Sequence, residues 1–212
     1  AKNAAAIAAL QALGRGARAF EVDVVSEASC RDFVAAAAQA FGRLDILVNN
    51  AGTSIRKPPQ SLSAVEWHTV IDTNLTSAFL CAQAAYPFLQ RAAGGKIINI
   101  SSLMAWFGAA FAAPYAASKA GVVQLTRSLA VAWAKDNIQV NAIMPGWIDT
   151  PLTRKGRVEI PGFYEEHVTR TPAGRWGTPE DFGGAAVFLA SGASQFVTGA
   201  VIPIDGGYSI QL

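Results

Sequence analysis

The chain has 212 residues, of which 51% are hydrophobic and 15% are charged, a composition typical of a folded globular protein and not of a disordered one. The 17 basic and 15 acidic side chains leave a formal net charge of +2 and are dispersed along the sequence, so we expect neither nucleic acid nor a membrane surface as a partner. Two cysteines without a Cys-x-x-Cys pattern argue against a metal site and favour a reducing, cytoplasmic location.

Helical and strand-like segments alternate along the whole chain. The expected helices cover residues 3–13, 28–41, 64–92, 113–134 and 179–190, and the expected strands cover residues 17–24, 44–48, 96–100, 138–143 and 201–204. Parallel strands need crossover connections of about a dozen residues, which helices supply. The alternation therefore predicts one doubly wound α/β domain, spanning residues 1–212, with helices on both faces of a parallel sheet.

One connection, residues 150–177, departs from this pattern. It is longer than an ordinary connection, carries Pro151, Pro161 and Pro172, and lacks a sustained helical period. Loops of this length usually act as lids or binding loops, so we expect residues 150–177 to form a lid over the substrate.

Small and polar residues follow the expected strands, at the edge where open α/β sheets bind ligands. Beside that edge, Tyr115 and Lys119 are spaced i, i+4 near the start of an expected helix, which places both side chains on one face. A free tyrosine has a pKa near ~10, too high for acid–base work at neutral pH, and a neighbouring ammonium would lower that pKa. The pair alone is typical of an ordinary amphipathic helix, so its meaning depends on the residues around it.

Those surroundings resemble the short-chain dehydrogenase/reductase family. The resemblance rests on Tyr115-x-x-x-Lys119, on Ser102, on Asn49-Asn50-Ala51-Gly52 and on Asn74 within Asp-Thr-Asn-Leu, which occur in the family's order. It implies a Rossmann-like fold and an enzyme that interconverts a secondary alcohol and a ketone with NAD or NADP. It also implies that Tyr115 is the general acid/base and that Lys119 lowers its pKa and binds the nicotinamide ribose. Ser102 would hydrogen-bond the substrate oxygen, and Asn74 would hold a water in a proton relay.

The same resemblance implies where the cofactor and the substrate bind. The residues expected to contact the cofactor are Asp23, Val24, Asn49, Ala51, Gly52, Tyr115, Lys119, Pro145, Gly146, Ile148 and Thr150. Trp147 is expected in the wall of the substrate site. Arg56, with Arg154, Lys155 and Arg157 of the lid, could pair with a substrate carboxylate, although an ordinary solvated side chain is an equally good interpretation. His68 and His167 show no partner pattern and are interpreted as structural or surface groups.

Residues 56–58, 72–79 and 146–151 are similar to segments of gluconate 5-dehydrogenase-like members of the family, which favours a sugar acid or a related small polyol or carbonyl compound as substrate. Two alternatives stay open: a 3-oxoacyl-carrier-protein reductase, which uses the same catalytic residues, and a cofactor-deficient fragment or scaffold without activity. The helices expected at residues 64–92 and 113–134 are apolar on more than one face, so we expect subunits to associate. The resemblance implies a homotetramer.

The family fold begins with a strand, a glycine-rich turn and a helix that bind the dinucleotide pyrophosphate. In this sequence Gly14 and Gly16 follow an expected helix and precede an expected strand, so they do not fit that turn. We therefore expect a fold without the first two strands of the family. Either residues 17–24 pair directly with residues 44–49, or the biological protein is longer than this sequence.

Overall fold

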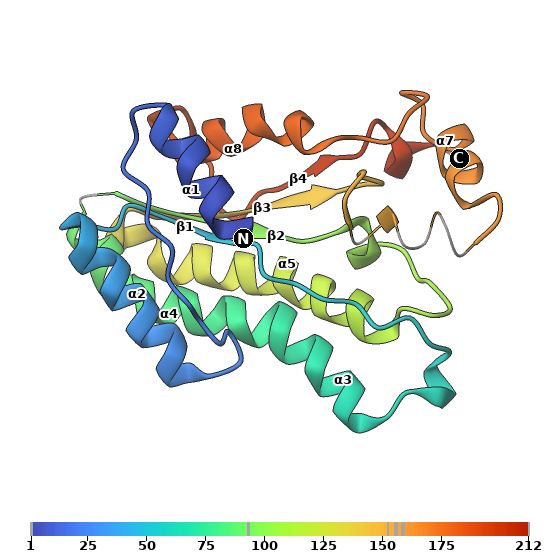
Figure 1. The fold of residues 1–212 in the computed structure, drawn as a ribbon, viewed down its shortest axis with the longest axis horizontal. Helices are drawn as coiled ribbons and strands as arrows, with labels where there is room; N and C mark the ends of the chain where they lie inside the picture. The colour runs from blue at the N-terminus through green and yellow to red at the C-terminus, as the bar shows by residue number, and fades with distance from the viewer. Residues whose placement is uncertain (1, 93, 152, 155–156, 158–159, 212) are drawn as a thin grey trace.

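The computed structural model describes residues 2–92, 94–151, 153–154, 157 and 160–211. Its parallel sheet has the strand order β1 (Ile46–Asn49), β2 (Gly95–Ile100), β3 (Ile138–Pro145) and β4 (Val201–Ile204). Helices α2 (Glu27–Phe41), α4 (Ser77–Arg91) and α5 (Ala113–Trp133) lie on one face of the sheet, and α8 (Gly183–Ala190) lies on the other (Figure 1). The predicted doubly wound, Rossmann-like α/β fold is confirmed.

The two central strands form the core of the sheet, because helices cover them on both faces. Residues 95–99 of β2 and 138–144 of β3 are buried, and the apolar side chains of both strands are interrupted only by buried polar residues such as Asn99 and Asn141. A chain of hydrogen bonds crosses this core: Asn49 Nδ2 donates to Asn99 Oδ1 over 2.9 Å, and Asn99 Nδ2 donates to Thr126 Oγ1 over 2.9 Å. The chain satisfies the buried amides and ties β1 to β2 and α5.

The helix expected at residues 64–92 is interrupted where the sequence places Asn74. Helix α3 (Ala64–Ile71) begins at a capping box formed by Ser63 and Glu66, and a π-helical turn, η2 (Asp72–Thr76), separates it from α4. Single π-helical turns are rare and frequently occur at functional sites.

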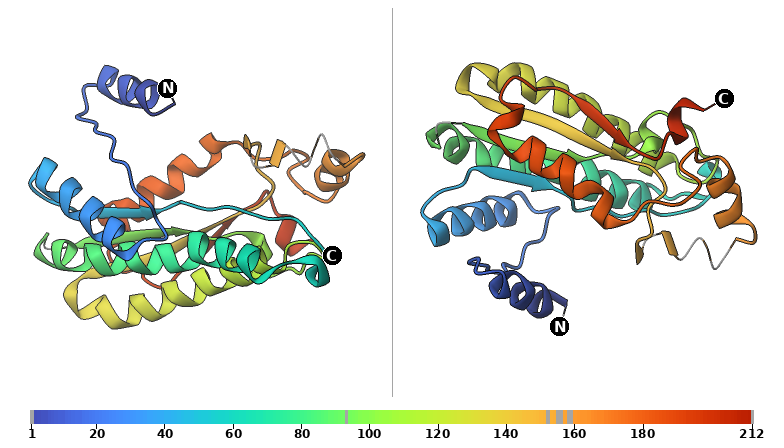
Figure 2. Two further views of the ribbon diagram at one scale, coloured as in Figure 1. Left: turned by 60° about the horizontal axis from the view of Figure 1, so that its bottom comes forward. Right: turned by 90° about the horizontal axis from the view of Figure 1, so that it is seen from above.

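The strand predicted at residues 17–24 does not form, and its direct pairing with residues 44–49 is wrong. In the part of the chain that the structure describes, β1 pairs only with β2. Residues 15–23 are extended without a ladder partner, and Val22 packs against the core beside Leu47. The segment is held by α2 instead, because Asp23 N donates to Ser29 Oγ over 2.9 Å. Figure 2 shows helix α1 (Lys2–Ala12), which precedes this segment, standing apart from the sheet.

The connection 150–177, whose sequence shows no sustained helical period, contains the short helix α7 (Phe163–Thr169). This helix is too short to show a period in sequence, and it is anchored by Phe163, which is buried against Trp147.

Among the helices of the described residues, none combines the length and apolarity needed to cross a membrane.

Gly95, at the start of β2, provides a test of this packing. A Cβ atom at Gly95 would lie 2.6 Å from Leu89 Cβ and 3.3 Å from Ile138 Cγ1. We expect Gly95→Ala to lower the free energy of unfolding by about 1–3 kcal/mol in urea titrations, because α4 and β3 must move apart. Gly108→Ala is the matched control, since a Cβ there has nothing within 4 Å. Equal stabilities of the two variants would contradict the packing described.

Candidate active site

Two connected cavities open at the carboxyl ends of the central strands. The first, here called the central cavity, has a volume of about 410 Å³, and its lining includes Ser102, Tyr115 and Lys119. The second, the lid cavity, has a volume of about 520 Å³, shares Ser102 and Tyr115 with the first, and extends beneath α7. Ser102, Tyr115 and Lys119, which the sequence singled out as catalytic candidates, thus line one cavity.

Lys119 is held at the end of β2 as a buried cation. Its Nζ donates to the Ile100 carbonyl over 2.8 Å and lies 5.7 Å from the centre of the Tyr115 ring. Ser101 Oγ donates to the Lys119 carbonyl over 2.9 Å, which is the structural role expected of Ser101. Because Lys119 is only 4% exposed, desolvation lowers its pKa from 10.5 to about 8.

The electrostatic surroundings of Tyr115 differ from the expectation. Burial raises the pKa of the Tyr115 phenol above its ordinary value, and the hydroxyl of Ser102 and the charge of Arg56 lower it only in part. The Lys119 ammonium donates its hydrogen bond to the Ile100 carbonyl, and its expected effect on the pKa of Tyr115 stays a prediction. Arg56 is therefore a contributor to the acidity of Tyr115 that the sequence pattern did not indicate.

Asn74 ties the loop after β1 to the helix that carries Tyr115. Its Oδ1 accepts from Thr53 N over 2.7 Å, and its Nδ2 donates to Thr53 O over 3.0 Å and to Ser118 Oγ over 2.9 Å. Ser118 Oγ in turn donates to the Tyr115 carbonyl over 2.8 Å. Ser118 was missed in the sequence, although its position between Tyr115 and Lys119 on an inward-facing helix could have indicated it. The side chain of Asn74 thus has a positioning role.

The residues expected around the nicotinamide do gather at the central cavity. Its lining includes Gly52, Pro145, Gly146, Ile148 and Thr150. The backbone at Gly52 runs close to two site residues, because a Cβ placed there would be in ordinary contact with Lys119 Nζ at 3.6 Å and with Asn74 Oδ1 at 3.4 Å.

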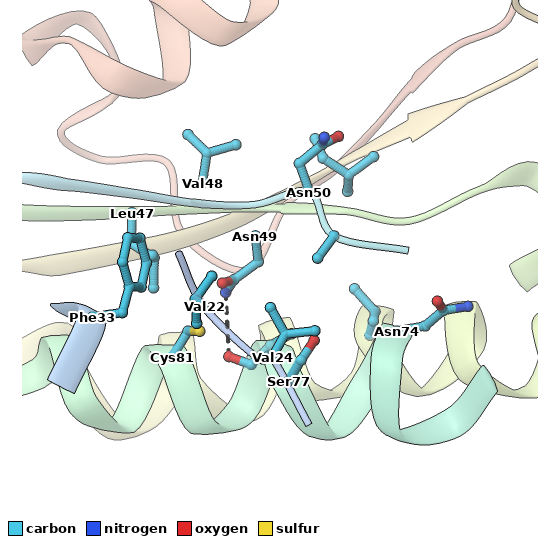
Figure 3. Close-up of a pocket in the computed structure, with 14 residues that line it drawn as sticks. Val22, Val24, Phe33, Leu47, Val48, Asn49, Asn50, Asn74, Ser77 and Cys81 are labelled. Carbon is cyan, nitrogen blue, oxygen red and sulfur yellow. Dashed lines mark hydrogen bonds between the residues drawn. The ribbon is translucent and has the colours of Figure 1, made fainter. Parts of the chain in front are cut away.

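The residues expected around the adenine are only partly brought together. A third cavity of about 160 Å³, the edge cavity, lies beside β1 and is lined by Val24, Asn49 and Ala51 (Figure 3). Asp23 is not among its lining residues. The side chain of Asn49 points towards α4 and donates to the Ala78 carbonyl over 3.2 Å. The amide nitrogen of Asn49 is thus engaged in the buried polar chain, while the residue lines the edge cavity, and its contact with the cofactor stays a prediction.

Arg56 and Trp147 line the lid cavity, where the sequence predicted substrate contacts. Arg154 and Arg157 do not line it, because both pair with Asp149, at 2.8 and 3.3 Å. Lys155, the remaining basic candidate of the lid, lies outside the described residues.

Two lid-cavity residues were missed. His167, interpreted from sequence as structural or surface, lines the cavity and lies 3.8 Å from Trp147 between ring centres, with Nδ1 2.7 Å from the Phe163 carbonyl. Arg170 lines the same cavity. The spacing of Phe163, His167 and Arg170, which places them on one face of a helix, was the signal available. Among the described residues, no three His, Cys, Asp or Glu side chains are grouped to hold a metal ion.

A buried lysine, a tyrosine and a serine line one cavity at the carboxyl edge of the parallel sheet in this Rossmann-like protein. Comparison with known proteins agrees: the family model described as enoyl-(acyl carrier protein) reductase matches residues 1–209. The chain belongs to the short-chain dehydrogenase/reductase family.

Its similar relatives include oxidoreductases named for sugar acids. It is 42% identical over 198 residues to the 2-dehydro-3-deoxy-D-gluconate 5-dehydrogenase of Dickeya dadantii, covering 93% of this chain and 78% of the relative. It is 46% identical over 167 residues to the 5-keto-D-gluconate 5-reductase of Escherichia coli, covering 79% of this chain and 65% of the relative. The structure of a gluconate 5-dehydrogenase from Burkholderia cenocepacia, in complex with NADP and tartrate, matches with a TM-score of 0.93 and 37% identity, over 99% of this chain and 82% of that one.

The buried ammonium of Lys119 predicts a pH dependence of stability. The folded chain releases this proton near pH 8 and the unfolded chain holds it until about 10.5, so in this window the unfolded state binds more protons. The free energy of unfolding therefore increases with pH, by about 2 kcal/mol between pH 8 and 9.5 relative to Lys119→Met. Urea titrations across this range measure the difference. Lys135→Met, at an exposed lysine, is the control and should show the pH profile of the wild type. If Lys119→Met and the wild type had the same pH profile, the lowered pKa of Lys119 would be refuted.

Proposed function

We propose that this chain is an NAD- or NADP-dependent oxidoreductase that interconverts a secondary alcohol and a ketone on a sugar acid or a related small polyol or carbonyl compound. The observation that carries the proposal is the shared cavity lined by Ser102, Tyr115 and Lys119. The names of the relatives from Dickeya dadantii and Escherichia coli support the substrate class.

The residues of the central cavity fit the nicotinamide half of such a cofactor. The lining of this cavity, which has a volume of about 410 Å³, includes Gly52, the buried cation Lys119, and the residues Pro145, Gly146, Ile148 and Thr150. Lys119 is suited to hold the ribose hydroxyls of the cofactor. The backbone of Ile148 and the side chain of Thr150 are suited to contact its carboxamide. The cofactor supplies or accepts the hydride when bound.

The proton transfer falls to Tyr115. Its phenol is the acid that protonates the substrate oxygen in reduction and the base that removes the proton in oxidation. Ser102, at the junction of the two cavities, donates a hydrogen bond to the same oxygen, which carries developing negative charge. The side chain of Asn74 is already engaged with Thr53 and Ser118, so we assign a relay water to the main chain of the π-helical turn instead of to the amide.

The lid cavity is the proposed substrate site, with residues 150–177 as its lid and Trp147 in its wall. Arg56 is the proposed partner of the substrate's carboxylate, because its guanidinium lines the cavity and can bind a carboxylate in bidentate geometry. Arg56 also lowers the pKa of Tyr115, so this cation acts on the residue that transfers the proton.

We also propose a cytoplasmic homo-oligomer, a tetramer by the family resemblance. Val122 and Val123 of α5 are buried within the chain, so they do not provide the contact surface. Phe79 of α4 and Val131 of α5 are 41% and 83% exposed, and these apolar positions are the candidates for covering by a second copy.

Tyr115→Phe tests the assignment of the acid. We expect it to reduce kcat for 5-keto-D-gluconate by about 10²- to 10⁴-fold while nucleotide binding, followed by NADH and NADPH fluorescence, is retained. Tyr164→Phe, at a tyrosine that lines neither the central nor the lid cavity, is the matched control. A wild-type chain that binds neither nucleotide would support the scaffold alternative, and turnover of a carrier-linked 3-oxoacyl thioester in place of the sugar acid would support the carrier-protein reductase.

Arg56→Ala tests the recognition of the carboxylate. We expect the variant to lose about tenfold or more in kcat/KM for 5-keto-D-gluconate relative to its loss for the neutral ketone fructose. The change in the acidity of Tyr115 affects both substrates, so the ratio isolates the carboxylate contact. Arg154→Ala, which removes a cation paired with Asp149 outside the cavity, should leave the ratio unchanged. Equal losses for both substrates in Arg56→Ala would remove Arg56 from carboxylate binding.

A further inference from the structure

The arginines around the lid cavity fall into two groups. Arg154 and Arg157 pair with Asp149, and Arg175 pairs with Asp181 over 2.8 Å. Arg56 and Arg170 line the lid cavity, and within the described part of the chain neither lies within 4.0 Å of a carboxylate. The cations that face the cavity are thus the ones whose charge is not neutralised by the protein.

Both of these guanidinium groups are held in place by aromatic rings. Arg56 lies 5.7 Å from the ring centre of Phe163 and 5.9 Å from that of Phe111. Arg170 lies 4.6 Å from the ring centre of Tyr208 and 5.9 Å from that of Phe107. A stacked guanidinium keeps its N–H edge free for a bidentate contact with an anion, and the stacking reduces the conformational entropy that such a contact would cost.

The two cations have separate ring partners in the cavity. His167 contacts one partner of each cation, at 4.5 Å from Phe163 and 6.2 Å from Tyr208 between ring centres. Arg56 shares the cavity with Tyr115, and Arg170 caps the C-terminus of α7 against Tyr208. One carboxylate on a short substrate can satisfy one of these sites, which leaves the other cation facing the cavity.

We propose that the lid cavity binds a sugar acid with an anionic group at each end, a dicarboxylate in which Arg170 holds the carboxylate remote from Arg56. This proposal rests on the proposed function, because it names the substrate class of the same site and uses Arg56 as the first anchor. The volume of about 520 Å³ is large enough for a six-carbon dicarboxylate. Glu166, one helical turn before Arg170, also lines the cavity and opposes the second carboxylate.

The test compares D-glucarate with D-gluconate, which differ only in having a carboxylate or a hydroxymethyl group at the sixth carbon. Isothermal titration of the full chain with each compound measures binding without cofactor or turnover, so the result is independent of the proposed activity. We expect D-glucarate to bind about tenfold or more tightly than D-gluconate. Arg170→Gln should abolish this preference, because it should lose about tenfold more affinity for D-glucarate than for D-gluconate.

Two further variants separate recognition from general changes in charge. Arg154→Gln removes an equal charge from the lid at a site paired with Asp149 and should retain the preference. Glu166→Gln removes the opposing carboxylate and should strengthen the preference. Equal affinities of the wild type for the two acids, or a preference that survives Arg170→Gln, would overturn the proposal, and either result would leave the assignment of Tyr115 intact.

Discussion

The amide of Asn74 is the contact on which the geometry of the site depends. Its side chain is 2% exposed, and it uses both N–H donors and one acceptor position to join Thr53 and Ser118. Thr53 directly follows Gly52, and Ser118 bonds to the carbonyl of Tyr115. Because a buried amide left without partners costs about 1–3 kcal/mol, this arrangement is strongly preferred over any that separates the loop from the helix.

Around this scaffold lie two cations, Lys119 and Arg56, and neither is paired with a carboxylate of the described residues. Lys119 is buried with a backbone carbonyl as its partner, and desolvation lowers its pKa to about 8. Arg56 adds a second cation whose charge acts on Tyr115. The same burial opposes ionisation of the phenol, so its pKa reflects the balance between desolvation and these polar neighbours. A tyrosine in such a position favours the protonated form, which is the form required to donate a proton to a substrate oxygen.

Much of this architecture was predictable because it depends on local periodicity. The apolar runs of β2 and β3 predicted buried parallel strands, and the spacing of Tyr115 and Lys119 predicted a shared face. The expected strand at residues 17–24 was wrong because a strand is defined by its neighbour, which hydrophobicity along one segment does not encode. Residues 17–24 would have the same β-type composition with or without a neighbouring strand to pair with.

The site was less predictable wherever one side chain had two possible partners. Asn49 stood in a motif that resembles a cofactor turn, yet its amide completes the chain to Asn99 and Ala78. Sequence could not distinguish Arg154 and Arg157 from Arg56, because the decisive difference is the position of Asp149 in space. His167 and Arg170 were missed for a related reason: α7 is too short to present a period, and only the folded lid brings its face to the cavity.

The packing of α7 affects both arginines that line the lid cavity. Helix α7 carries Phe163, which is a ring partner of Arg56, and ends beside Arg170, which stacks on Tyr208. A displacement of α7 would therefore change the surroundings of both unpaired cations together. Asp149 and Asp181 hold the remaining arginines at the base of the lid, so they do not compete for the cavity. The packing of α7 and the orientation of Arg56 therefore depend on the same ring, since Phe163 anchors the helix against Trp147 and contacts the guanidinium group.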